Sequence, residues 1–345
     1  MKHFEAQPVA MAEALDAKWI ATDLAKRQTI KKGLVGALVL FLALVPFGVT
    51  SPYFYHVVVI AGIFAMLALS LNLILGYVGQ FPLGHQLFFG LGAYTAALIS
   101  PHTGGNFVIA MASSVALCGL VGLLIGLPTL KMKGPAFVIV SLAFNEIFFL
   151  IAWNWLEFTG GPDGITGIPY PSLFGLALKN KTGLYYLMVI LVVVVAILNL
   201  RIMSAKTGRK YLAIRENPEL AQSLGVNPYM SKLQAFVISA MFGGLAGCFY
   251  AQFERFVSPS VFGFDYLTMM LVMVWVGGLG TIAGPIVGAI LITFLHEYLD
   301  VFGIWRWVIF GVILLACVFY MPKGLAGTAA SILKRIRRRG TSHAD

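Results

Sequence analysis

Long apolar stretches separated by short polar segments run through most of the chain. An α-helix needs about 20 apolar residues to cross a hydrocarbon layer about 30 Å thick. Ten stretches reach or approach that length: residues 34–49, 57–75, 83–99, 107–127, 135–153, 184–200, 234–253, 266–276, 285–299 and 305–320. The pattern predicts an all-α fold, a polytopic bundle of about ten transmembrane helices. The eighth stretch is short, so we expect it to extend at an end or to be broken.

Composition agrees with a membrane protein. Hydrophobic residues make up 59% of the 345 residues and charged residues 11%, against about 45–50% and about 25% in a soluble domain. The three cysteines, Cys118, Cys248 and Cys317, lie in apolar stretches without a second Cys or a His at metal-ligand spacing. We therefore expect neither a disulfide nor a metal site.

The basic residues predict the orientation. With the N-terminus inside, 20 of the 24 Lys and Arg residues fall in inside segments, and only Lys179, Lys181, Arg255 and Arg306 fall outside or at span edges. Basic residues are enriched in cytoplasmic segments of membrane proteins. Both termini are thus predicted to be cytoplasmic, and nucleic acid is excluded as the reason for the formal charge of +10.

This topology divides the chain into three parts. Residues 1–33 form a cytoplasmic N-terminal segment, for which an interfacial helix and a disordered tail both remain open. Residues 34–325 form the transmembrane domain, with a polar cytoplasmic loop at 201–232 and an outer loop at 154–183. Residues 326–345 form a basic cytoplasmic tail, which we expect to contact anionic membrane lipid.

Two glycine-rich breaks fall on the predicted cytoplasmic side. One contains Gly76, Gly79 and Gly84, and the other contains Gly277, Gly278, Gly280 and Gly284. Irregular backbone at membrane depth needs protein or a water-filled cavity to satisfy its amides. The breaks are interpreted either as partly re-entrant segments near a translocation path or, with more weight, as tight turns that let helices pack closely.

Ionisable residues within a span are expensive and therefore informative. Glu146 lies near the middle of the fifth stretch, and Ser141 and Asn145 accompany it. We expect this polar stripe to face the bundle interior, where it either lines the path of a polar solute or bonds a neighbouring helix. Asn72 is interpreted as a packing hydrogen bond.

No arrangement of residues typical of an enzyme occurs. The six histidines are scattered, and the chain has neither HExxH nor GxSxG. It also lacks GxxxxGK[ST], so we expect it to bind no ATP by itself. The chain is predicted to have no catalytic residues and no cofactor of its own.

Local signals in loop 201–232 predict a short helix over residues 218–224. Asn217 is a favoured N-cap, Pro218 suits the first helical position, Glu219 complements the positive helix end, and Gly225 suits a left-handed C-terminal residue. In the outer loop, TGGPDGITGIP at residues 159–169 is dense in turn residues and is not expected to form a helix.

Several motifs in order resemble the LivM-type permeases of high-affinity branched-chain amino acid ABC transporters. They are LGYVGQFPLGHQLFFGLGAYTAALI (75–99), GPAFVIVSLAFNEI (134–147), TGGPDGI (159–165), AIRENPELAQSLGVN (213–227), KLQAFVISAMFGGLAGCFYA (232–251) and MPKGL (321–325). The likeness spans about residues 34–325 and leaves the N-terminal 33 residues outside.

The resemblance implies partners and roles. Such a permease of the bacterial inner membrane pairs with a second, LivH-like permease, sits on two cytoplasmic ATPases that bind ATP and Mg, and receives solute from a periplasmic binding protein. It implies that loop 201–232 holds the coupling helix, with Arg215, Glu216, Asn217, Pro218, Glu219, Ala221 and Gly225 facing the ATPase. The outer loop would meet the binding protein, with Glu157, Asp163 and Arg255 as candidate contacts.

Other solutes and mechanisms stay open at this point. Relatives with similar motifs carry urea, short amides or aromatic acids. A proton- or sodium-coupled secondary transporter using Glu146 is a different class of function, and a structural membrane subunit is a third.

Overall fold

The computed structural model describes residues 51–299, except 133 and 174, and a few positions between 302 and 325. The N-terminal segment, the first predicted span and the basic tail lie outside the described residues, as does most of the tenth span. Residues from Pro52 onward form one compact unit, described here by itself.

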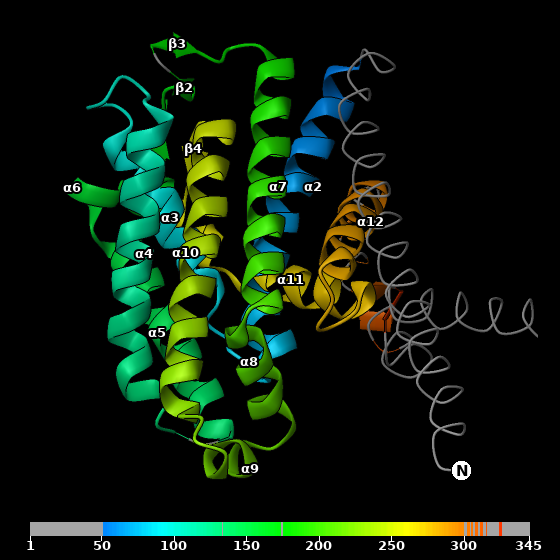
Figure 1. Cartoon of the computed structure of the whole chain (residues 1–345). Coiled ribbons are helices and arrows are strands. Elements are labelled where there is room, and N and C mark those ends of the chain that lie inside the picture. Colours follow the sequence, from blue (N-terminus) through cyan, green and yellow to red (C-terminus); the bar gives the residue numbers. More distant parts are fainter. Residues whose placement is uncertain are drawn as a thin grey trace, which may run out of the picture. The chain divides into compact units, whose positions relative to one another are not determined.

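Helices make up most of the described residues of this unit (Figure 1). In chain order they are α2 (Pro52–Asn72) with a π-helical turn η1 (Leu73–Tyr77), α3 (Gln86–Ile99), α4 (Phe107–Thr129), α5 (Pro135–Asn154), α6 (Leu156–Thr159), the 3-10 turn η2 (Gly161–Asp163), α7 (Lys181–Ser204), α8 (Lys206–Glu216), α9 (Pro218–Ser223), α10 (Pro228–Glu254), the 3-10 turn η3 (Pro259–Phe262), α11 (Phe264–Gly277) and α12 (Ala283–Leu299). Eight of the ten predicted stretches coincide with a helix.

The described residues include four two-residue strands in the loops that connect the helices. They are β1 (Ile165–Thr166), β2 (Ser172–Leu173), β3 (Leu176–Ala177) and β4 (Phe256–Val257). β1 pairs antiparallel with β4, and β2 with β3. Figure 1 shows β2 and β3 at one end of the bundle and α9 at the other.

Among the described residues, five helices are long and apolar enough to cross a membrane: α2 with η1, α4, α5, α7 and α10. Helices α3, α11 and α12 are apolar but shorter. The short eighth stretch does extend, because α11 has 14 residues, yet at about 1.5 Å per residue it covers only about 21 Å. The predicted extension is thus confirmed, but the helix is still shorter than a hydrocarbon layer about 30 Å thick.

Helices α2 and α10 form the centre of the described unit. Within the α2 span 89% of the most apolar window is buried, whereas the corresponding share in α5 is 22%. Helix α10 packs on α3 and α4, and α2 packs on α7 and α12. Close approach depends on glycine: a Cβ at Gly92 or at Gly247 would collide with backbone of the facing helix.

Several helices begin earlier than hydropathy alone predicts. Asn180 caps α7 by accepting from Thr182 N, and Asn227 caps α10 by accepting from Met230 N. These caps lie four and seven residues before the predicted starts at 184 and 234. Polar residues in the first turn of a membrane helix are therefore part of the helix and not of the loop.

Candidate functional site

Helix α9 confirms the predicted cytoplasmic-loop helix, one residue shorter at its end. The side chain of Asn217 accepts hydrogen bonds from Glu219 N and Leu220 N at 3.0 Å each. Gly225 has φ 82°, and its N donates to Gln222 O. Both ends of this two-turn helix are therefore closed by residues next to it in sequence, as helix capping requires.

The outer surface of α9 is exposed and partly apolar. Leu220 and Leu224 are 59% and 76% exposed, whereas Ala221 is buried beneath them. Glu219 and Pro218 are also exposed. Two large apolar side chains in an otherwise polar segment mark a surface suited to contact with another protein.

A hollow of about 860 Å³ lies beside α9. The loop between α4 and α5 contributes Lys131 to its wall, α9 contributes Glu219 and Gln222, and the start of α10 contributes Tyr229. The Tyr229 hydroxyl donates to Leu127 O at 2.7 Å and so fixes the start of α10 to the end of α4. Gln80, from the segment between η1 and α3, also lines it, so the hollow has walls from four parts of the chain.

Helix α8, which precedes α9, was not predicted. Its N-cap residue Ala205 makes no side-chain cap bond, so the local start signal is absent. Tyr211 and Ile214 are buried on one face, and burial raises the pKa of the Tyr211 hydroxyl to about 12. In the sequence, the apolar residues Tyr211 and Ile214 are three positions apart, a helical spacing that could have predicted α8.

Arg215 turns away from α9 and reaches the first glycine break. Its Nη1 donates a hydrogen bond to Gly76 O. Its aliphatic stem lies beside Gly79, where a Cβ would be 3.1 Å from Arg215 Cγ, and its Nη1 lies beside Gly280, where a Cβ would be 2.9 Å away. The guanidinium therefore sits where the two breaks meet. Arg215 contacts the transmembrane domain of its own chain, whereas the resemblance implied an ATPase contact.

Asn72 joins the same two breaks. Its Nδ2 donates to Thr281 O at 2.8 Å, and its Oδ1 accepts from Gly280 N at 2.9 Å. The prediction that Asn72 makes a packing hydrogen bond is confirmed, and the partners lie more than 200 residues away. We name Asn72, Arg215, Gly76 and Gly280 the inner joint.

The glycines of the breaks serve close packing. A Cβ at Gly76 would lie 2.6 Å from Gly280 N, and one at Gly84 or Gly277 would collide with a backbone carbonyl group of another segment. The close packing expected of these glycines is therefore confirmed at these positions. Gly324, in the MPKGL motif, also packs here, because a Cβ on it would lie 2.5 Å from Gly278 N.

The polar residues of α5 divide between two faces. Ser141 accepts from Leu83 N at 3.0 Å, and Asn145 donates to Phe262 O at 2.9 Å; both side chains are buried. Glu146 is exposed beside the exposed apolar Ile147. The prediction that the whole stripe faces the interior is wrong for Glu146, because adjacent residues in an α-helix point about 100° apart.

The outer loop is ordered by its glycines. Gly160, Gly161, Gly164 and Gly167 all have φ between 59° and 74°, a left-handed conformation that side chains with a Cβ disfavour. The loop contains only the one-turn α6 and the 3-10 turn η2 before β1, which agrees with the expected turn-dense structure.

The three candidate docking residues differ in how far this chain engages them. Arg255 donates from Nε to Ile168 O at 3.0 Å, and its Cζ lies 4.5 Å from the centre of the Tyr170 ring. These contacts hold the end of α10 to the outer loop. Glu157 and Asp163 are exposed on that loop. Arg255 thus has a structural task that sequence reasoning missed.

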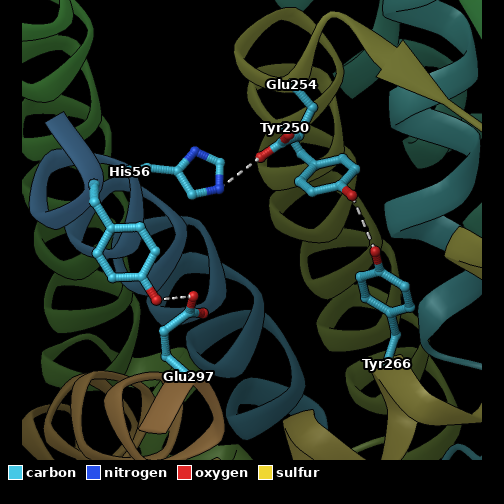
Figure 2. A network of polar contacts seen from close by, with 6 residues as sticks. His56, Tyr250, Glu254, Tyr266 and Glu297 are labelled. Carbon is cyan, nitrogen blue, oxygen red and sulfur yellow. Dashed lines mark hydrogen bonds and ion pairs between the residues drawn. The ribbon is translucent and has the colours of Figure 1, made fainter. Parts of the chain in front are cut away.

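A second polar region, also missed, lies between α2, α10, α11 and α12 (Figure 2). His56 Nε2 is 3.6 Å from Glu254 Oε1, the hydroxyls of Tyr250 and Tyr266 are 3.0 Å apart, and Tyr53 donates to Glu297. These residues come from separate parts of the chain, and no local pattern in the sequence connects them. Across the described part of the chain, no group of three His, Cys, Asp or Glu residues is arranged to hold a metal ion.

Comparison with known proteins agrees with this architecture. Residues 53–318 match the family described as "Branched-chain amino acid transport system / permease component". The chain is 33% identical over 321 residues to the high-affinity branched-chain amino acid transport system permease protein LivM of Escherichia coli K12, covering 86% of this chain and 75% of that protein. It is 32% identical to the LivM protein of Salmonella typhimurium, covering 76% and 67%.

A more distant relative is the probable branched-chain amino acid transport permease protein LivM of Methanocaldococcus jannaschii, which is 23% identical over 76% of this chain and 90% of its own length. No solved structure matches the chain. The family match covers most of the sequence and all five long apolar helices. The chain is therefore a multi-pass membrane protein and belongs to the family of permease components of branched-chain amino acid transport systems.

Proposed function

We propose that the chain is the membrane permease subunit of an ATP-driven ABC importer for branched-chain amino acids. Its family and the names of its relatives support the transport class and the solute. The observation that carries the mechanism is the inner joint: Arg215, at the end of α8 and next to the α9 cap, bonds Gly76 O, and Asn72 links that break to Gly280 and Thr281. Movement of α9 would thus be transmitted through α8 to the end of α2 and to the break between α11 and α12.

The proposed assembly contains partners that supply what this chain lacks. Two cytoplasmic ATPases bind ATP and Mg and dock on α9, so the chain itself needs no cofactor. A second, LivH-like permease completes the membrane part, and a periplasmic binding protein delivers the solute. Hydropathy supports ten spans, the distribution of Lys and Arg supports cytoplasmic termini, and the bacterial relatives support placement in the inner membrane.

The α9 surface supports ATPase docking. Leu220 and Leu224 offer apolar contact area, and Glu219 adds a negative charge beside them. Three other predicted coupling residues shape this helix: Asn217 caps it, Gly225 ends it, and Ala221 packs beneath it. Closure of the ATPases on ATP would then press α9 against the neighbouring loop between α4 and α5, and Arg215 would carry the displacement to the glycine breaks.

The exposed face of α5 supports a contact with the second permease. If Glu146 faced lipid at mid-membrane, inserting its charged side chain would cost about 2.5–3.5 kcal/mol of free energy or more. A partner helix or a water-filled path between the two permeases would remove that cost. We therefore propose that Glu146 borders the translocation path at the subunit boundary, while Ser141 and Asn145 hold α5 against the bundle.

The outer loop supports binding-protein docking. Its glycine turns and the β1–β4 pair give it a defined shape, and Glu157 and Asp163 present two carboxylates on its surface. Arg255 would act in docking through the loop that it holds in place.

Docking on α9 is tested by co-purification of the ATPases with charge and backbone variants. Glu219→Lys reverses a favourable charge at the helix N-terminus, and Gly225→Val puts a β-branched residue at φ 82°. Both are expected to weaken ATPase association without affecting membrane insertion. Glu157→Lys makes the same charge change at the other end and serves as the control. Unchanged association in both α9 variants would contradict the docking assignment.

The transport class is tested by reconstituting the chain with its partners in vesicles. ATP-driven leucine uptake that is indifferent to proton and sodium ionophores is expected, and uptake by this chain alone would support a secondary transporter instead. Thermal-shift screening of the binding protein with leucine, urea, short amides and aromatic acids identifies the solute. Glu146→Gln is expected to lower uptake while assembly stays intact, and normal uptake would leave Glu146 with a packing role.

A further inference from the structure

The second polar region encloses a cavity of about 370 Å³. Its walls come from α2, α10, α11 and α12, and Figure 2 shows His56, Tyr250, Glu254, Tyr266 and Glu297 around the gap between these helices. Helix α10 begins next to α9 and contains 27 residues up to Glu254, a length of about 40 Å. The cavity therefore lies at the end of the bundle opposite α9.

The charges around the cavity favour a cation. Glu254, Asp265 and Glu297 contribute three carboxylates, whereas no Lys or Arg of the described chain lines it. His56 and His296 are the remaining ionisable groups of its wall other than the tyrosines. A cavity with carboxylates and apolar walls concentrates the electrostatic field and attracts the opposite charge.

The geometry favours an organic cation over a metal ion. No three carboxylate or imidazole groups within the described residues converge at ligand distances for a metal. The cavity has room for several non-hydrogen atoms, and the rings of Phe64, Tyr250 and Tyr266 contribute to its wall. Aromatic faces attract organic ammonium groups.

A buried hydroxyl supports the presence of a ligand. Thr293 lines the cavity and is only 4% exposed. Its Oγ1 has no hydrogen-bond partner among the residues that the structure describes. Buried polar atoms without a partner are rare in proteins, and each calls for an explanation such as a bound polar group.

We propose that this cavity binds a primary ammonium group. Its N–H bonds would be accepted by the carboxylates of Glu254 and Glu297 and by Thr293 Oγ1, and its carbon chain would lie against Phe64 and the tyrosine rings. Because no Lys or Arg of the described chain lines the wall to pair with a carboxylate, the site matches an amine better than the zwitterion of an amino acid. The ammonium can come from a free amine or from the head group of phosphatidylethanolamine. The proposal does not depend on the identity of the imported solute.

Binding is measured with ethylammonium on the full chain in phosphatidylglycerol nanodiscs, which contain no ammonium group. Saturable binding is expected in the wild type, with about tenfold weaker affinity in Glu254→Gln and in Glu297→Gln, since each loses a charge-assisted hydrogen bond. Thr293→Val keeps the side-chain shape and is expected to bind several-fold more weakly. Glu157→Gln removes an exposed carboxylate of the outer loop and is the matched control.

The outcomes separate the sources and the alternatives. Weaker ethylammonium binding in nanodiscs with phosphatidylethanolamine, together with lipid retention that Glu254→Gln abolishes, identifies the lipid as the source. Equal binding in both nanodiscs identifies a free amine. The proposal is overturned if folded Thr293→Val and both carboxylate variants bind ethylammonium like the wild type, if no saturable binding occurs, or if leucine binds this cavity more tightly than ethylammonium.

Discussion

The inner joint and the cavity between α2, α10, α11 and α12, called the outer cavity below, are both polar clusters among apolar helices, but they are built differently. In the inner joint, Asn72 and Arg215 bond backbone groups of two glycine breaks, and these glycines leave no room for a side chain. In the outer cavity, side chains meet side chains around a space of about 370 Å³. Directional bonds to backbone fix relative positions of helices, whereas loosely spaced side chains can accommodate a ligand. The first is suited to transmit movement and the second to bind.

Removing the side chain of Arg215 should produce the largest effect. Arg215→Ala loses a charge-assisted bond to Gly76 O, and hydrogen bonds of that kind contribute about 1.5–3 kcal/mol. We expect ATP-driven uptake to fall about tenfold or more while ATPase co-purification is retained, because α9 keeps its own caps. Arg215→Lys should recover part of the uptake. Uptake within twofold of wild type in the alanine variant would contradict the joint.

A Cβ at the second break should come next. Gly280→Ala places a methyl group 2.9 Å from Arg215 Nη1 at φ 71°. Gly104→Ala has a similar φ of 61° with nothing within 4 Å, so it reports backbone strain alone. The strain costs about 1–2 kcal/mol in both, and we expect the Gly280 variant to have a lower Tm than the Gly104 variant. Equal Tm values would mean that the inner joint can accommodate a methyl group at Gly280.

Loss of the α9 cap should have a moderate effect. Asn217→Ala removes the acceptor for Glu219 N and Leu220 N, at a cost of about 1 kcal/mol. A two-turn helix depends on such caps, so we expect weaker ATPase association that high ATPase concentration restores. Combining Asn217→Ala with Arg215→Ala tests independence. If the losses of uptake in the two single variants add in the double variant, the cap and the joint act independently. If they do not add, the two act together.

The smallest effect is expected in the outer cavity. Tyr250→Phe loses a single neutral hydroxyl pair with Tyr266, worth about 1 kcal/mol or less. The expected Tm change is small and ATP-driven uptake should stay near wild type. A loss of uptake as large as that of Arg215→Ala would show that the outer cavity also transmits movement, which would erase the contrast between the two regions.

Local signals predicted the parts of the structure that depend on neighbouring residues. Asn217, Pro218 and Gly225 predicted α9 because capping acts within about four residues. The glycines of residues 159–169 predicted a turn-dense loop because only glycine adopts positive φ freely. Hydropathy located eight of the ten stretches on helices but misplaced the starts of α7 and α10, since polar first turns do not register as apolar.

By itself the sequence determined the helical membrane architecture, the short helix α9 and the family, because hydropathy, capping and ordered motifs act along the chain. Tertiary structure decided which polar residues meet. Arg215 and Gly76 are 139 residues apart and Asn72 and Thr281 are 209 apart, and the outer cavity gathers groups from four helices. It also decided that Glu146 faces outward while its neighbour Asn145 faces inward. Such pairings depend on how helices rotate and pack, and that is set by close contacts such as those of Gly92 and Gly247, not by local pattern.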